Sequence, residues 1–191
     1  HLWYRRQRQM CIRDSTLEML ECIKYLKNEI KDYRLEKITN ELISSLLMMV
    51  HKISKEDALK KIEQVLSNGA AAEKFEKMTS ALGGPKNILS TYETDLRNES
   101  KARDIFSDKE GWIEKIHTRE LGLILIELGG GRKQVSDKIN YGVGYDSVIS
   151  VGEKIDSTKP LLQLHSNKED NSKELEERIK DCFIISDQEM N

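Results

Sequence analysis

One stretch constrains the fold more than any other part of the chain, namely TRELGLILIELGGGRKQVSDKINYGVG at positions 118–144. Four aliphatic residues in it follow i, i+3, i+4, i+7 spacing, which places them on one face of a helix: Leu121, Ile124, Leu125 and Leu128. We predict that Thr118 is the N-cap, because its hydroxyl can accept a bond from a backbone N–H. The three glycines at 129–131 end the helix, since glycine enters the left-handed C-cap conformation without a Cβ clash.

The same stretch carries an ordered series of motifs: T-R-x-L-G, L-G-G-G-R and S-D-x-I-x-Y-x-V-G. Further motifs follow at 151–156 (V-G-x-x-I-D) and 160–165 (P-L-L-Q-L-H), and others precede it at 17–26 (L-E-x-x-E-x-I-x-x-L) and 65–75 (V-L-S-N-G-A-A-A-E-K-F). In this order they closely resemble the C-terminal part of thymidine phosphorylases and pyrimidine-nucleoside phosphorylases. The resemblance extends over residues 16–191.

Composition excludes several classes of protein. The chain has 191 residues, of which 34% are charged and 38% hydrophobic, as in a soluble protein. No apolar run approaches the roughly 18 residues of a membrane span. A net charge of −2 argues against nucleic acid as the main partner. The three cysteines lack metal-ligand spacing, so a reduced, cytoplasmic setting is expected.

The first 15 residues, HLWYRRQRQMCIRDS, differ from the rest because they contain four arginines and a single acidic residue. Such an arm could bind nucleic acid or a membrane. It lacks the apolar segment of a targeting peptide. We favour a third interpretation, in which residues 1–15 are a non-native leader that resembles translated adapter sequence.

Helical periodicity predicts helices over 16–27, 33–50, 54–68 and 70–82, with a short helical turn over 88–92. The buried stripe of the third is expected to include Leu59 and Val65, and that of the fourth Met78 and Leu82. These helices could form a bundle. The resemblance implies instead that they cover one face of a sheet encoded upstream, so that their apolar faces are partly exposed in this chain.

Residues 94–108 are polar and are the best candidate for a domain boundary. Beyond them, strands are predicted over 112–117, 138–145, 147–150 and 160–165, then a helix over 172–182 and an edge strand over 183–185. The fold class is therefore α/β (α+β). We divide the chain into the leader (1–15), the helical layer of a truncated α/β domain (16–97) and a C-terminal domain (98–191), which the resemblance makes an α/β hammerhead.

Few residues are candidates for a site. His117 and Arg119 lack a nucleophile or carboxylate partner that the sequence can place, so a structural use is favoured. Arg132, Lys133 and Lys138 could suit a phosphate, but glycine-rich loops bind phosphate when they open a helix, and these glycines close one. No catalytic residue is assigned. The resemblance implies one metal ligand, Glu21, which matches a glutamate that binds a monovalent cation such as K⁺ in some relatives.

The resemblance also implies a function for a longer parent protein, which is a transferase that cleaves thymidine or another pyrimidine nucleoside with inorganic phosphate. Such enzymes are homodimers, they need no organic cofactor, and their phosphate- and base-binding residues precede the region matched here. We therefore expect this chain to be a fragment without the active site. Two alternatives are a carrier domain of the biotinyl or lipoyl type, for which the Met-Lys-Met triplet is missing, and a non-catalytic binding or scaffold module.

Overall fold

The computed structural model describes residues 16–30, 32–96, 100–166 and 173–189, and the predicted leader lies outside these ranges. The chain divides into two compact units. One unit is Glu18–Arg97, and the other is Asn98–Asn191 together with the first 17 residues. We call them the helical unit and the C-terminal unit. Among the described residues, no helix is long and apolar enough to cross a membrane.

The helical unit contains every helix that periodicity predicts before residue 97, and its described residues form no strand. The helices are α2 (Thr16–Leu26), α3 (Tyr33–His51), α4 (Lys55–Ser67), α5 (Ala70–Ala81) and α6 (Ile88–Asp95). Side chains outside the helices set two of the starts. Asp32 accepts bonds from two backbone N–H groups of α3, and Ser54 accepts one from the N–H of Asp57. The hydroxyl of Ser54 also donates to the Asp57 carboxylate at 2.7 Å, so these two side chains pair at the start of α4.

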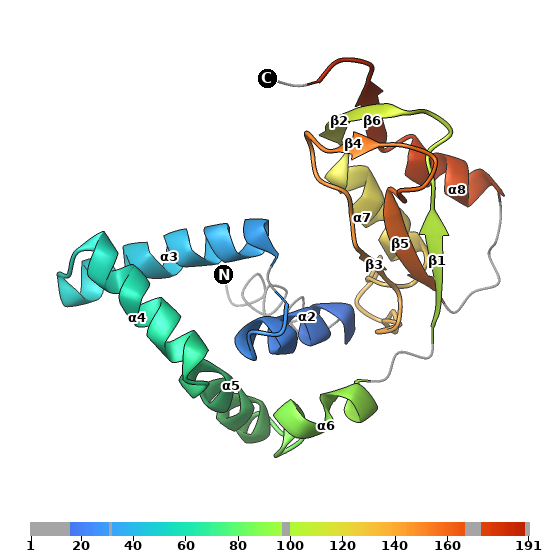
Figure 1. Ribbon diagram of the computed structural model, residues 1–191. Helices are drawn as coiled ribbons and strands as arrows, with labels where there is room; N and C mark the ends of the chain where they lie inside the picture. Colours follow the sequence, from blue (N-terminus) through green and yellow to red (C-terminus); the bar gives the residue numbers. More distant parts are fainter. Residues whose placement is uncertain (1–15, 31, 97–99, 167–172, 190–191) are drawn as a thin grey trace. The chain divides into compact units, whose positions relative to one another are not determined.

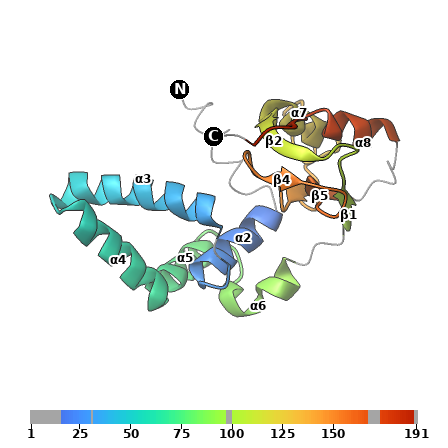
Figure 2. The ribbon, with the colours of Figure 1, turned by 45° about the horizontal axis from the view of Figure 1, so that its top comes forward.

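The core of the helical unit is small and lies between α2, α5 and α6. Its buried members are Ile23, Ile88 and Tyr92, with Leu20, Phe75, Leu89 and Leu96 packed against them. Helices α3 and α4 diverge from their connection like the arms of a V (Figures 1 and 2). The most buried residue of α3 is Ser44, while most of the large apolar side chains of that helix are exposed. This confirms the expectation that apolar helix faces are partly exposed.

Four of the side chains predicted to be buried are exposed, namely Leu59, Val65, Met78 and Leu82. They lie on or directly after α4 and α5, whose buried residues include only Ala58, Ile62 and Ala72. The prediction was wrong because a helical apolar stripe is buried only where a second surface meets it.

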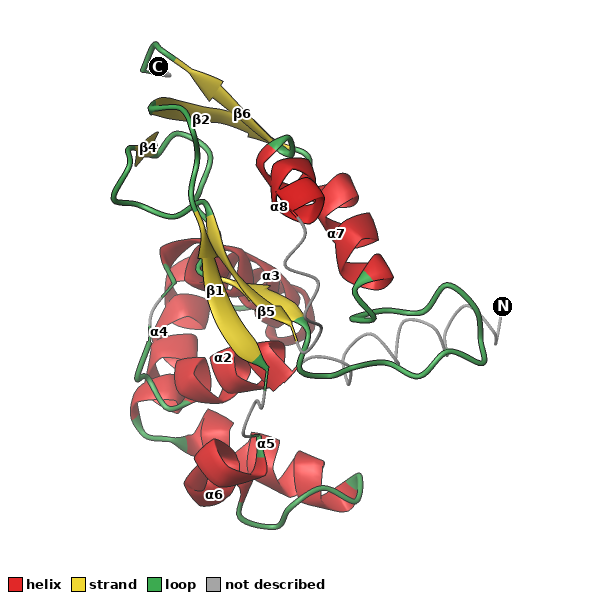
Figure 3. Cartoon of the chain, turned by 90° about the vertical axis from the view of Figure 1, so that its right-hand side faces the viewer, coloured by secondary structure: helices red, strands yellow, loops and turns green. Residues whose placement is uncertain are grey.

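The C-terminal unit is mixed α+β, with two three-stranded antiparallel sheets and two helices among its described residues (Figure 3). The first sheet has the order β1-β5-β3, from β1 (Lys101–Ile105), β5 (Leu162–Ser166) and β3 (Gly144–Asp146). The second has the order β4-β2-β6, from β4 (Lys154–Ile155), β2 (Gly111–Ile116) and β6 (Phe183–Ser186). The helices are α7 (Thr118–Glu127) and α8 (Lys173–Lys180).

Both sheets and both helices contribute to one hydrophobic core. Its buried residues are Ile105, Ile113, Leu121, Ile124, Leu128, Val143, Ile149, Ile155, Leu161, Leu162, Leu164, Leu175, Ile179, Cys182 and Phe183. Three of the four residues on the predicted stripe of α7 belong to this core, and Leu125 packs against it. The core therefore forms around the stretch that the sequence singles out.

Several local predictions in this unit need correction. The N-cap of α7 is His117 and not Thr118, because the chain is already helical at Thr118. Strand β1 was not predicted and lies inside the polar segment 94–108, while the division between the two units, after Arg97, falls within that segment. Residues 138–143 and 147–150 are not strands, and only Gly144–Asp146 pairs, with β5. The edge strand predicted at 183–185 is confirmed as β6.

Candidate functional site

Glu21, the predicted metal ligand, lies on α2 and is exposed. Its neighbour Cys22 has a raised pKa, first because the thiol is buried and second because of the negative charge of Glu21. Nowhere in the described ranges do three or more His, Cys, Asp or Glu side chains form a group that could hold a metal ion. Glu21 is thus part of no such group within the part of the chain that the structure describes.

His117 occupies the junction between β2 and α7. Its backbone N–H donates to the carbonyl of Cys182 at 2.8 Å, which ties the start of α7 to the end of α8. The side chain of His117 is partly buried and makes no capping bond to the helix, while Arg119 is exposed on the first turn of α7. The backbone bond to Cys182 therefore accounts for the position of His117 without a role for its side chain.

The three glycines after α7 close the helix as predicted. Gly129 has a φ of +94°, and the N–H of Gly130 donates to the carbonyl of Leu125 at 2.9 Å. Both later glycines are packed closely: a Cβ on Gly131 would lie 2.7 Å from Cγ1 of Ile126. Glycine is required here for a helix stop and for close packing.

The basic loop that follows, with Arg132, Lys133 and Lys138 exposed, already contains an anion of its own. The carboxylate of Asp137 accepts bonds from the backbone N–H groups of Lys133, at 2.9 Å, and Gln134, at 2.8 Å. Backbone N–H groups of this kind would otherwise be the donors for a bound phosphate. The loop is therefore closed by its own carboxylate, which agrees with the weak phosphate reading of the sequence.

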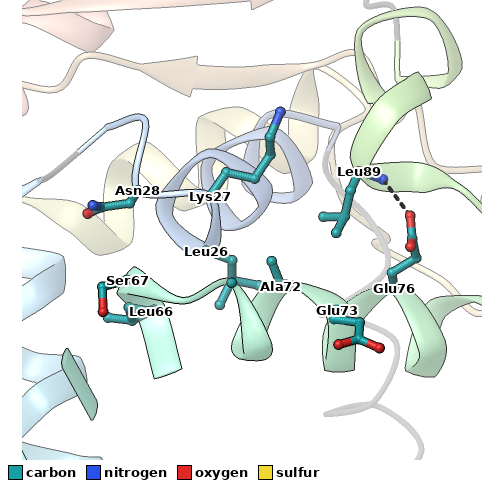
Figure 4. Close-up of a pocket in the computed structure, with 10 residues that line it drawn as sticks. Leu26, Lys27, Asn28, Leu66, Ser67, Ala72, Glu73, Glu76 and Leu89 are labelled. Atoms are coloured by element: carbon teal, nitrogen blue, oxygen red, sulfur yellow. Dashed lines mark hydrogen bonds between the residues drawn. The ribbon is translucent and has the colours of Figure 1, made fainter. Parts of the chain in front are cut away.

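A hollow of about 420 Å³ lies in the helical unit (Figure 4). It is lined by Leu26, Lys27, Asn28, Leu66, Ser67, Gly69, Ala72, Glu73, Glu76 and Leu89. No local motif in the sequence marks this hollow, because its walls come from α2, α4, α5 and α6.

The charged groups of this hollow bind other parts of the unit. The ammonium of Lys27 lies 2.6 Å from the carboxylate of Glu29 and 4.6 Å from the centre of the Tyr92 ring. The carboxylate of Glu76 accepts a bond from the N–H of Leu89 at 3.1 Å (Figure 4). Glu73 pairs with Lys77 one turn later. The polar groups therefore stabilise α2, α5 and α6. A catalytic site requires polar groups that converge on a common point, and these do not.

In the C-terminal unit a cluster of charges surrounds Lys180. Its ammonium lies 3.0 Å from the Asp108 carboxylate and 3.3 Å from those of Glu176 and Glu177. The bond to Asp108 is the first cause of the raised pKa of Lys180. This contact joins α8 to the loop between β1 and β2 across 72 positions of sequence, so no local pattern could predict it.

Two further groups in this unit are nucleophilic in type, the partly buried Tyr145 and the buried Cys182. Burial is the main cause of the raised pKa of each. The Tyr145 hydroxyl donates to the carbonyl of Leu121 at 3.2 Å, and the Cys182 thiol donates to that of Arg178 at 3.3 Å. A raised thiol pKa disfavours the reactive thiolate, so Cys182 is a packing residue.

Residues 112–186 match the family model described as the pyrimidine nucleoside phosphorylase C-terminal domain. This range runs from β2 to the end of β6 and includes α7, with its glycine stop, and α8. Residues 112–186 of the C-terminal unit are therefore similar to this domain. The match confirms the resemblance that the motifs at 118–165 indicated.

Within this pyrimidine nucleoside phosphorylase C-terminal domain, the ionisable groups described above serve packing and ion pairs. The match covers neither β1 nor the helical unit. For the helical unit, the motifs at 17–26 and 65–75 remain the link to the phosphorylases.

Proposed function

We propose that this chain is the C-terminal part of a thymidine phosphorylase or another pyrimidine-nucleoside phosphorylase, which is a pentosyltransferase. The observation that carries the proposal is the match of residues 112–186 to the C-terminal domain of this family. Two further observations support it. The motif resemblance continues upstream to residue 16, and α3 to α5 expose apolar side chains of the kind that would cover a sheet.

The reaction of the complete protein would be reversible phosphorolysis. An oxygen of inorganic phosphate attacks C1′ of the nucleoside, the bond from C1′ to the base nitrogen breaks, and the base leaves with the electron pair and takes up a proton. The products from thymidine are thymine and 2-deoxyribose 1-phosphate. Sugar transfer of this type has an oxocarbenium-like transition state. Catalysis then depends on positioning the phosphate and stabilising the departing base.

The residues for those two tasks are expected upstream of position 16, and the chain itself is proposed to be inactive. The pairing of the charged groups supports this. Lys27 at the hollow pairs with Glu29, Lys180 pairs with Asp108, and Asp137 occupies the N–H groups of the basic loop. The C-terminal domain, which we expect to be an α/β hammerhead, would instead support the large domain as it closes on its substrates. The parent is proposed to be a cytoplasmic homodimer.

For Glu21 we retain the proposal of a K⁺ ligand in the parent only. A carboxylate oxygen suits a hard cation. Glu21 is nevertheless exposed, and the described side chains do not complete a site around it, so they do not fit a bound cation in this chain. No step of the reaction is assigned to the cation.

The test begins with the coding sequence upstream of residue 16 in the same genomic source. We expect it to encode a glycine-rich phosphate loop and base-binding Arg, Ser and Lys residues in place of residues 1–15. The restored protein should release thymine from thymidine and phosphate, measured by the change in ultraviolet absorbance, while the 191-residue chain should not. If the native gene begins with the arginine-rich segment, or if the 191-residue chain is active, the proposal is wrong.

A further inference from the structure

The turn between α4 and α5 contains the one asparagine in the sequence that a glycine follows, Asn68 with Gly69. Asn68 is exposed, so water reaches its side chain, and Gly69 has a φ of +78°. Glycine has no side chain to shield its backbone nitrogen. The nitrogen of Gly69 can therefore approach the side-chain amide carbon of Asn68, with which it would close a five-membered ring.

One hydrogen bond holds the two reacting groups together. The side-chain oxygen of Asn68 accepts a bond from the backbone N–H of Ala70 at 3.0 Å. This bond closes a ring of atoms that includes both the amide carbon of Asn68 and the nitrogen of Gly69, so it keeps the amide beside that nitrogen. Fixed proximity of this kind removes much of the entropic barrier to an intramolecular reaction.

The N–H of Ala70 would also stabilise the intermediate of the reaction. When a nitrogen adds to an amide carbon, negative charge develops on the amide oxygen, and a backbone N–H that already points at this oxygen stabilises the charge. The N–H of Gly69 itself donates to the carbonyl of Leu66 at 3.3 Å, which is long for a backbone bond. The attacking nitrogen is therefore held only weakly by the helix that precedes it.

We propose that Asn68 is a site of spontaneous deamidation in the folded chain. The nitrogen of Gly69 forms a bond to the amide carbon of Asn68 and loses its proton to water. The bond from that carbon to the amide nitrogen breaks, and ammonia leaves with a proton from water. Water then opens the cyclic imide at one of its two carbonyls, which gives aspartate or isoaspartate. The reaction concerns the helical unit alone and does not depend on the proposed function.

The two products would have different effects on the turn. Aspartate keeps an oxygen that can accept from Ala70, and a negative charge suits the start of α5. Isoaspartate instead adds one carbon to the backbone at the residue that is the C-cap of α4 and directly precedes the N-cap of α5. Isoaspartate is therefore the product that would disturb the connection between these two helices.

The test is incubation of the folded 191-residue chain at mildly alkaline pH, followed by tryptic digestion and mass spectrometry. The tryptic peptide 62–74 contains Asn68 and should gain mass with time, because a carboxyl group is heavier than an amide. Isoaspartate in this peptide is identified by methylation with an isoaspartyl methyltransferase. A synthetic peptide of the same sequence is incubated in parallel, and we expect the folded chain to convert at least as fast.

Two comparisons separate this turn from asparagine chemistry in general. Asn28 is also exposed and has a positive φ, +60°, but Glu29 follows it, so Asn28 should stay unmodified in the same sample. Gly69→Ala places a methyl group beside the attacking nitrogen and should slow conversion by about tenfold. A Cβ at this position would meet nothing within 4 Å, so circular dichroism should show that the helices are retained.

Three outcomes would overturn the proposal. If Asn68 stays intact while the synthetic peptide converts, the folded turn protects this residue. If Asn28 converts as fast as Asn68, the following glycine is not the cause. If Gly69→Ala converts as fast as the unchanged chain, the nitrogen at position 69 is not the attacking group.

Discussion

Replacing Gly111 by alanine tests whether this residue permits the close pairing of β2 with β6. Gly111 has a φ of +146°, which side-chain-bearing residues rarely adopt. A Cβ there would lie 2.4 Å from the carbonyl oxygen of Ser186 and 2.8 Å from Cγ2 of Ile185, both in β6. Backbone strain of this kind costs roughly 1 to 3 kcal/mol. Forcing extra volume against a neighbouring strand costs about the same again, roughly 1 to 3 kcal/mol. We therefore expect Gly111→Ala to lower the free energy of unfolding by about 4 kcal/mol.

Two other glycines separate the contributions. Gly152 also has a positive φ, +86°, but a Cβ there would meet nothing within 4 Å, so Gly152→Ala should show only the conformational cost of about 1 to 2 kcal/mol. Gly122 lies inside α7, where a Cβ would again meet nothing within 4 Å and φ is not positive. Gly122→Ala should stabilise the unit by about 0.5 to 1 kcal/mol, because alanine loses less entropy than glycine in a helix.

The assay is urea denaturation followed by the fluorescence of Trp112, which is next to Gly111 in β2. The sequence has two tryptophans, so the measurement uses a Trp3→Phe background in which Trp112 is the remaining reporter. With an m-value of about 2 kcal/mol/M, a loss of 4 kcal/mol lowers the transition midpoint by about 2 M. The reasoning is refuted if Gly111→Ala unfolds at the same urea concentration as the Trp3→Phe chain without it, or if Gly122→Ala is as destabilised as Gly111→Ala.

Two further substitutions each remove a side chain that forms local hydrogen bonds. Asp32→Ala removes the acceptor for two N–H groups at the start of α3 and should cost about 1 kcal/mol, seen as a lower thermal midpoint of the helical circular dichroism; an unchanged midpoint would contradict it. Tyr145→Phe removes the bond to the carbonyl of Leu121 and should also cost about 1 kcal/mol at neutral pH. Burial raises the pKa of Tyr145, so its stabilising contribution is present below about pH 10, the unfolded value, and is lost as the pH rises beyond it. The unchanged chain should therefore lose more stability than Tyr145→Phe between about pH 9 and 11, and parallel urea midpoints over that range would contradict this.

Much of the helical structure could be predicted from the sequence because helices depend on near neighbours. The helical periodicity placed α2 to α5 within about two residues of their observed ends. The glycines after α7 gave the helix stop. The motifs at 118–165 also identified the domain family, since an ordered series of motifs can be recognised without knowing the fold.

The strands were predicted less well because pairing joins distant parts of the chain. Strand β1 reads as a polar linker, and it is a strand because Lys101 to Ile105 pair with Ser166 to Leu162 of β5, about 60 positions later. Residues 147–150 have a strand-like composition but pair with no strand, and Ser147 has a φ of +52°. The composition of a segment indicates its propensity to form a strand, but the strand forms only where another strand is available to pair with it.

The sequence by itself determined where the helices of this protein begin and end, and that its C-terminal part has the motifs of the phosphorylase domain. Only the tertiary structure decided which faces are buried. On α3 the apolar residues Ile38, Leu42, Leu46 and Val50 have the spacing of a buried stripe, yet they are exposed, while Ser44 on the other side of the helix is buried. The physical reason is that helix formation is satisfied by hydrogen bonds four residues apart, whereas burial of an apolar face requires a second surface that the local sequence does not encode.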